Sequence, residues 1–219
     1  MKKFILFAAF MSVLFTSFSQ SDKYMKAMQD KVAALDTTRT PENSQALSAA
    51  FERIADAEKD KWLPYYYAAL TQVNVGYFAN TDVMAGGMAS TFDPIADKAE
   101  SLLNKAEALT KDNSEIYVIR KMIASLRMIA DPMSRYMQYA PIAQEALDAA
   151  KKLNPENPRV YLLEGQDKFH TPEQYGGSKV QARELFETSI KKFESSHPAS
   201  SIDPHWGKAT AVYFLSQLK

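Results

Sequence analysis

The stretch LLNKAEALTKDNSEIYVI (residues 102–119) aligns without a gap with ALDAAKKLNPENPRVYLL (residues 146–163). Leucine, alanine, asparagine and tyrosine recur at equal positions, as Leu103 with Leu147 and Tyr117 with Tyr161. In both stretches, apolar residues three and four apart precede a short polar turn, and an aromatic residue follows it. Two amphipathic helices joined as a hairpin have this pattern. The alignment therefore predicts a repeated helical hairpin.

Looser copies of this unit lie on both sides. One is AFERIADAEKDKWLPYYY (residues 50–67), and another runs from Phe186 to Trp206. A side chain that can cap a helix also stands before proline at five places, and proline has no backbone N–H to leave unpaired in a first turn. These pairs are Thr40-Pro41, Asp93-Pro94, Asp131-Pro132, Asn157-Pro158 and Asp203-Pro204. The predicted helices cover residues 22–36, 41–59, 63–79, 93–110, 114–130, 132–153, 158–169, 178–194 and 204–218. We expect an all-α fold.

The first residues have the pattern of an export signal. Lys2 and Lys3 precede an apolar run at residues 4–15, and small residues then favour cleavage before Gln20. An uncleaved anchor would need a longer apolar span. We therefore expect a signal peptide at residues 1–19, no membrane insertion of the mature chain, and a periplasmic or secreted protein.

Composition limits the partners of the mature chain. The full chain has 26 basic and 26 acidic residues, and removal of two lysines with the signal leaves 24 against 26, a net charge of −2. This balance gives no general attraction for nucleic acid. The chain has no cysteine, so apolar packing has to stabilise it. We expect residues 20–219 to form one domain, and no cofactor is indicated.

The stretch HTPEQYGGSK (residues 170–179) resembles a phosphate-binding loop only superficially. Such a loop needs G-x-x-x-x-G-K-[ST] after a strand, and here the serine and lysine are in the reverse order. Ser178 with Gln181 instead has the spacing of a capping box. A helix start can still attract an anion, so a weaker alternative is an anion site at Gly176, Gly177, Ser178 and Lys179.

The sequence gives little support for catalysis or metal binding. His170, His197 and His205 lack the i, i+4 spacing of a helical zinc motif, and we predict no metal site. The chain has no G-x-S-x-G motif, which would expose a nucleophilic serine. We predict that the protein is not an enzyme and has no catalytic residues.

The spacing of small and aromatic residues resembles the tetratricopeptide repeat. Tyr161 followed four residues later by Gly165 is the best match, and Tyr65 with Ala69 is the next. The units recur every 44–52 residues, counted from Tyr65 to Tyr117, Tyr161 and Trp206, which is longer than the ~34 residues of that family. The chain is also similar to exported tetratricopeptide-like proteins of Bacteroidetes. The resemblance implies a right-handed superhelical array of antiparallel helix pairs over about residues 41–219, with the helix at 22–36 as a cap.

In that family the first helix of each unit lines a concave groove. Carried over by position, the groove-lining residues predicted to bind a ligand or partner are Tyr66, Asn74, Met122, Arg159, Gln166, Phe169 and His170. The surface would be largely apolar, so either it holds a ligand or another element covers it. The helix at residues 22–36 carries methionines at helical spacing and is the favoured cover.

The leading functional hypothesis is a non-enzymatic protein that binds a protein or peptide partner in the cell envelope. Tyr66, Arg159 and Gln166 would orient the bound segment. The alternative is a small-molecule binding component with an apolar pocket under Tyr66 and Phe169.

Overall fold

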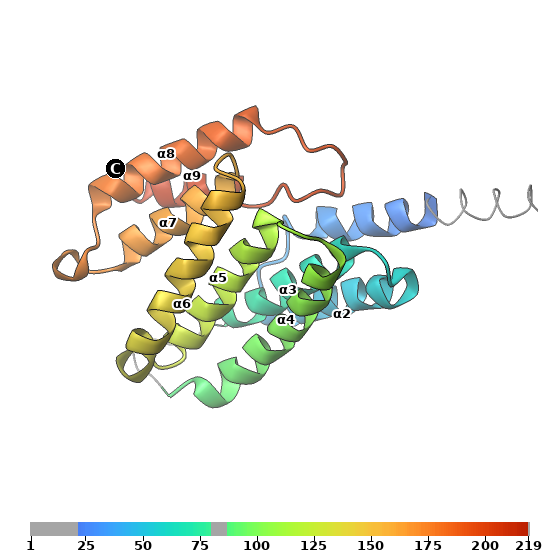
Figure 1. Cartoon of the computed structure of the whole chain (residues 1–219), viewed down its shortest axis with the longest axis horizontal. Helices are drawn as coiled ribbons and strands as arrows, with labels where there is room; N and C mark the ends of the chain where they lie inside the picture. Colours follow the sequence, from blue (N-terminus) through green and yellow to red (C-terminus); the bar gives the residue numbers. More distant parts are fainter. Residues whose placement is uncertain (1–21, 80–86, 219) are drawn as a thin grey trace, which may run out of the picture.

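The computed structural model describes residues 22–79 and 87–218, and within them every regular element is helical. Figure 1 shows the helices stacked side by side along the chain. After an N-terminal helix at residues 22–34, the elements are α2 (Pro41–Glu58), α3 (Trp62–Tyr77), α4 (Ala89–Leu109), α5 (Ser114–Ile129), α6 (Pro132–Leu153), α7 (Pro158–His170), the 3-10 turn η2 (Glu173–Tyr175), α8 (Lys179–Ser195) and α9 (Lys208–Ser216). The all-α prediction is confirmed for this part of the chain.

Three of the five predicted proline-led helix starts are confirmed. The side chains of Thr40, Asp131 and Asn157 each accept a hydrogen bond from a backbone N–H in the first turn of α2, α6 and α7. Each cap satisfies a donor that has no partner inside the helix. The residues that start a helix are thus fixed locally at these three places.

The other two predicted starts are wrong. Helix α4 begins at Ala89 and contains Pro94, because the extra first turn buries Phe92 completely. Asp93 does not cap α4, and its carboxylate instead accepts two hydrogen bonds from Arg135, at 2.6 and 2.8 Å. Helix α9 begins only at Lys208, after a long connection from α8.

Consecutive helices pack against each other, and glycine permits the closest approaches. At Gly165 an added Cβ would lie 2.6 Å from Cε1 of Phe186, and at Gly76 it would lie 2.6 Å from Leu126. The small residue that follows Tyr161 by four positions is therefore required by helix packing. Phe186 belongs to a small second core at the C-terminal end of the molecule, apart from the main core.

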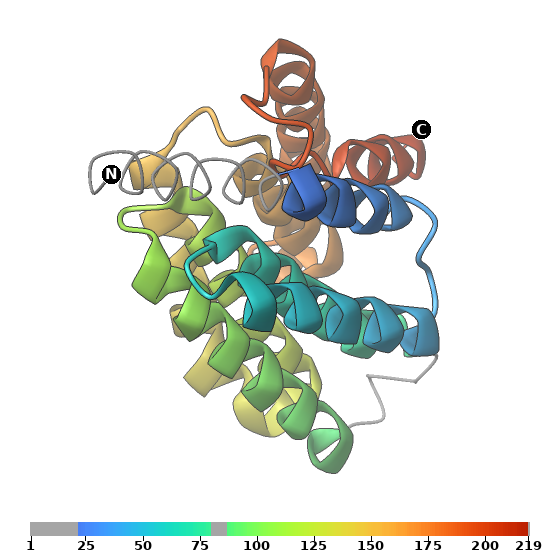
Figure 2. The same cartoon turned by 90° about the vertical axis from the view of Figure 1, so that its right-hand side faces the viewer.

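The N-terminal helix packs against the core formed by the first helices of the described chain. Its Met28 and Val32 are buried in the same core cluster as Tyr66 and Tyr67 of α3. The connection between α8 and α9, residues 196–207, approaches the same end of the molecule (Figure 2), and Tyr67 Oη donates a hydrogen bond to the carbonyl of Ile202 in it. The N-terminal helix and the connection thus both pack against α3.

No helix in the described part of the chain is long and apolar enough to cross a membrane. The predicted signal peptide at residues 1–19 lies outside the described residues.

Candidate functional site

The polar side chains predicted to line the groove meet in one buried network. The carboxylate of Glu115 accepts hydrogen bonds from Tyr66 Oη at 2.7 Å, Asn157 Nδ2 at 2.7 Å and Arg159 Nη1 at 3.0 Å. Trp206 Nε1 donates to Tyr66 Oη at 2.8 Å. The network joins α3, α5 and α7 to the connection between α8 and α9. Most of its acceptors and donors satisfy one another, as buried polar groups generally do, but Nε of Arg159 is buried without a hydrogen-bond partner in the described structure.

Burial makes this network structural in character. Tyr66 has no exposed surface, and burial together with the Glu115 carboxylate raises the pKa of its hydroxyl. The guanidinium of Arg159 packs over the ring of Trp206, 5.1 Å from its centroid. Tyr66 and Arg159 are both closed off from solvent, and Trp206 lies against the hydroxyl of Tyr66.

A second polar contact joins the middle of α5 to α7. Lys121 is buried, and its Nζ lies 2.7 Å from Oδ1 of Asp167. Lys121 stands where the tetratricopeptide pattern prefers a small residue, and this ion pair gives the lysine a structural role. Nearby, Tyr77 Oη donates to the carbonyl of Met122, whose side chain is itself buried.

Three of the four accessible groove positions lie in the second half of α7. Gln166 and Phe169 are partly exposed and His170 is exposed, and Asn74 of α3 is also partly exposed. The structure therefore divides the seven predicted positions between a closed interior and an open end.

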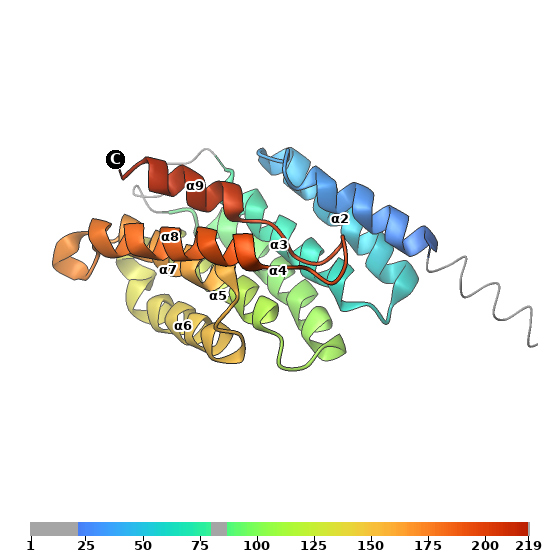
Figure 3. The ribbon, with the colours of Figure 1, turned by 90° about the horizontal axis from the view of Figure 1, so that it is seen from above.

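Aromatic rings gather at this open end, where α9 packs on α7 and α8 (Figure 3). Phe214 of α9 lies 5.2 Å from Phe169 and 5.5 Å from both His170 and Phe186, measured between ring centroids. Tyr213 adds a ring that is 58% exposed. We call Phe169, His170, Phe186, Tyr213 and Phe214 the aromatic cluster.

Sequence reasoning missed the contribution of α9. The helix KATAVYFLS is apolar on most sides, so its periodicity does not mark Tyr213 and Phe214 as facing a site. The signal that could have found them is this excess of apolar residues on a short helix, which leaves Val212 and Tyr213 exposed.

The imidazole of His170 is kept neutral. Partial burial against the aromatic cluster and the nearby ammonium of Lys179 lower its pKa. A neutral imidazole has an available nitrogen lone pair and can accept a hydrogen bond or ligate a metal ion. Within the described residues no cluster of three or more acidic or histidine side chains could hold a metal ion by itself.

A pocket of about 310 Å³ lies beside the aromatic cluster, between the end of α7 and the start of α8. We call it the α7–α8 pocket. Its lining residues are Lys168, Phe169, His170, Thr171, Pro172, Glu173, Ser178 and Lys179. The volume falls at the lower end of the ~300–1,000 Å³ typical of small-molecule sites. The pocket thus adds basic groups to an aromatic surface.

The HTPEQYGGSK stretch forms the wall of this pocket. Ser178 Oγ accepts a hydrogen bond from Gln181 N at 3.2 Å, which confirms the predicted cap. Gly176 has a φ of +93°, and a Cβ on Gly177 would lie 1.7 Å from the carbonyl oxygen of Thr171. Both glycines are therefore required by the turn.

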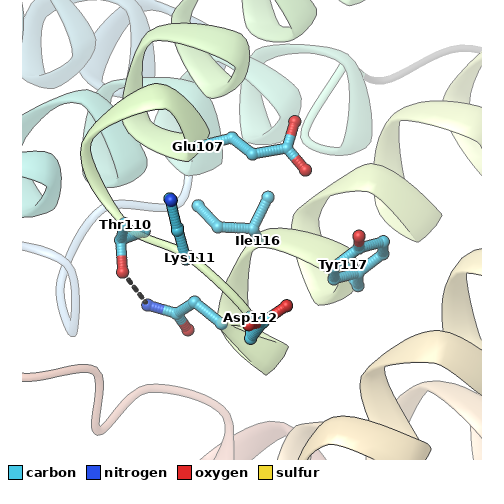
Figure 4. Close-up of a pocket in the computed structure, with 7 residues that line it drawn as sticks. Glu107, Thr110, Lys111, Asp112, Ile116 and Tyr117 are labelled. Carbon is cyan, nitrogen blue, oxygen red and sulfur yellow. Dashed lines mark hydrogen bonds between the residues drawn. The ribbon is translucent and has the colours of Figure 1, made fainter.

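A second hollow, at the turn between α4 and α5, is less suitable. It measures about 210 Å³. Figure 4 shows mostly polar side chains around it, with Asn113 hydrogen-bonded to Thr110. Asn113 also caps α5 through the N–H of Glu115. These side chains stabilise the turn and the start of α5, and the aromatic cluster does not border this hollow.

No family model matches the chain, and no curated protein matches it. One solved structure, described as the HusA haemophore from Porphyromonas gingivalis, is similar to it. The two sequences are 35% identical, the match covers 90% of this chain and 92% of that one, and the TM-score is 0.77. That relative is a binding protein rather than an enzyme, and its organism belongs to the Bacteroidetes.

Proposed function

We propose that this chain, which belongs to the family of the HusA haemophore, is an exported protein that captures haem. The observation that carries this proposal is the 35% identity over nearly the full length of both proteins. A haemophore is a protein that captures haem, and its ligand is therefore a flat, largely apolar ring with charged substituents. Haem would be the cargo of this protein, released again to a later acceptor, and not a resident cofactor.

The aromatic cluster with the adjoining α7–α8 pocket is the surface that best suits such a ligand. Phe214 offers a partly exposed ring beside Phe169, and aromatic faces stack favourably on other flat π-systems. His170 adds a neutral imidazole on the same surface. The side chains of the Tyr66 network near the N-terminal helix are, in contrast, buried.

This proposal corresponds to the small-molecule alternative of the sequence analysis. The leading hypothesis, a protein or peptide held along the concave face, has weaker support because Tyr66, Met122 and Arg159 are buried. The predicted signal peptide and the right-handed, tetratricopeptide-like superhelix are further parts of the proposal. An exported carrier of this kind would act in the periplasm or outside the cell.

An absorbance titration tests the proposal. Ligand-free mature protein would be titrated with ferric haem, and we expect a saturable shift of the Soret band at one equivalent. Phe214→Ala should weaken binding about tenfold or more, because it removes an apolar ring from the site. Tyr136→Ala, which removes an exposed ring on α6 that is outside the aromatic cluster and the pocket lining, is the matched control and should leave the affinity unchanged.

Two results would count against the proposal. Absence of saturable haem binding would remove it altogether. Equal affinities of the wild type and the Phe214→Ala variant would place the site elsewhere in the molecule.

A further inference from the structure

The α7–α8 pocket contains two ammonium groups that no carboxylate neutralises within the described residues. Lys168 Nζ donates to the carbonyl of Gly176 at 3.1 Å, and Lys179 Nζ donates to the carbonyl of Phe169 at 2.7 Å. Neither lysine has a carboxylate oxygen within 4.0 Å in the described structure. A lysine ammonium has three donors, so each keeps donors for a ligand.

The pocket carries a net positive charge. Its lining contains the two lysines and one acid, Glu173, while His170 is neutral at pH 7. Some lysines of this half of the molecule are paired, as Lys151 is with Glu164, and others, such as Lys191, stand alone on a helix face in the described structure. What distinguishes this pocket is that two unpaired ammonium groups lie together beside the aromatic cluster.

The Lys179 ammonium and the aromatic cluster meet at Phe169. Lys179 Nζ lies 3.3 Å from the centroid of the Phe169 ring. Phe169 in turn contacts Phe214 within the aromatic cluster. Because the ammonium covers a face of Phe169, a ligand that lay on Phe214 beside it would bring its edge to the lysines. The arrangement fits a flat apolar molecule that carries carboxylates on one side.

We propose that Lys168 and Lys179 bind the propionate carboxylates of the cargo, so that the protein selects porphyrins with free carboxylates. This inference rests on the proposed function and adds a specificity determinant to it. Hydrogen bonds between an ammonium and a carboxylate are among the stronger ones in proteins. The weak anion site suggested by Gly176–Lys179 thus becomes one edge of the haem site, with the side chain of Lys179 as its main donor.

The test compares ferric protoporphyrin IX with its dimethyl ester, both in the same dilute detergent. The wild type should bind the free acid about tenfold or more tightly than the ester, which cannot accept the same ionic bonds. The Lys168→Gln/Lys179→Gln double variant should bind both forms alike, at about the ester's affinity. Lys191→Gln, at an exposed position of α8, is the matched control and should discriminate as the wild type does.

The outcomes separate the two proposals. If the wild type binds the acid and the ester equally well, haem capture stands and the role of the lysines is refuted. If the wild type binds neither, the proposed function fails and this inference fails with it. Because both lysines are at the surface, the double variant should fold, and circular dichroism checks this. The conservative variant Lys168→Arg/Lys179→Arg should restore most of the preference for the free acid.

Discussion

Removal of the Tyr66 hydroxyl tests whether this residue stabilises the fold or binds the ligand. Tyr66→Phe removes one oxygen and keeps the ring, so packing is preserved. The change breaks the bond to Glu115 at 2.7 Å and the bond from Trp206 at 2.8 Å. It leaves the indole N–H of Trp206 and one carboxylate oxygen of Glu115 without these partners.

The expected loss of stability follows from these two bonds. A hydrogen bond to a charged partner contributes roughly 1.5–3 kcal/mol and a neutral one roughly 0.5–1.5 kcal/mol. We therefore predict that Tyr66→Phe lowers the free energy of unfolding by about 2–4 kcal/mol. In urea, with a slope of roughly 2–3 kcal/mol per M, the midpoint should fall by about 1 M. The haem affinity of the folded protein should stay within about twofold of the wild type.

The assay is urea unfolding followed by tryptophan fluorescence, with haem titration of the same samples. Tyr65→Phe is the matched control, because the Tyr65 hydroxyl makes no hydrogen bond within the described structure. It should change stability by less than about 0.5 kcal/mol. An unchanged midpoint for Tyr66→Phe, together with a tenfold loss of haem affinity, would refute the structural role and return Tyr66 to the binding site.

Three further predictions concern packing and charge. Gly165→Ala should destabilise the protein by about 1–3 kcal/mol and weaken haem binding, because its Cβ would lie 2.6 Å from a ring atom of Phe186; thermal unfolding and haem titration check this, and a more stable variant would contradict it. Met28→Ala should lower the free energy of unfolding by about 2–5 kcal/mol, since the side chain is fully buried. Urea unfolding measures this change, and a decrease of less than about 0.5 kcal/mol would show that the N-terminal helix is not packed on the core. The pKa of His170 should be below its ordinary value of 6.5. As the pH falls from 6.5 to this lower pKa, the unfolded chain binds more protons than the folded protein, so the free energy of unfolding should decrease. An NMR titration assigned with His170→Gln measures this pKa, and a value above 6.5 would contradict the prediction.

Local signals in the sequence predicted most of the fold. The spacing of apolar residues indicated the helical hairpins, and Thr40, Asp131 and Asn157 marked helix starts by caps formed within three residues. The start of α4 was missed because a buried ring, Phe92, outweighed the local preference of Asp93-Pro94 for a helix start.

The candidate site depended more on contacts distant in the sequence. Tyr66 and Trp206 are 140 residues apart, and no periodicity connects them. The predicted groove positions lie on α3, α5 and α7, but which of them are exposed depends on the elements that pack over these helices. Phe169 and His170 were identified from the repeat register, whereas Phe214 reaches them only through the fold of the C-terminal segment. The proposed ligand comes from the similarity to a haemophore, since no residue motif specifies haem.

The most direct test of haem capture at the aromatic cluster is an NMR comparison of the mature protein with and without one equivalent of ferric haem. The paramagnetic iron broadens the amide signals of residues close to it. We predict that signals from residues 165–180 and 208–218 broaden selectively, while those of α2 and the N-terminal helix persist. Broadening centred on α3 and the N-terminal helix, or no selective broadening at all, would contradict the assignment of this site.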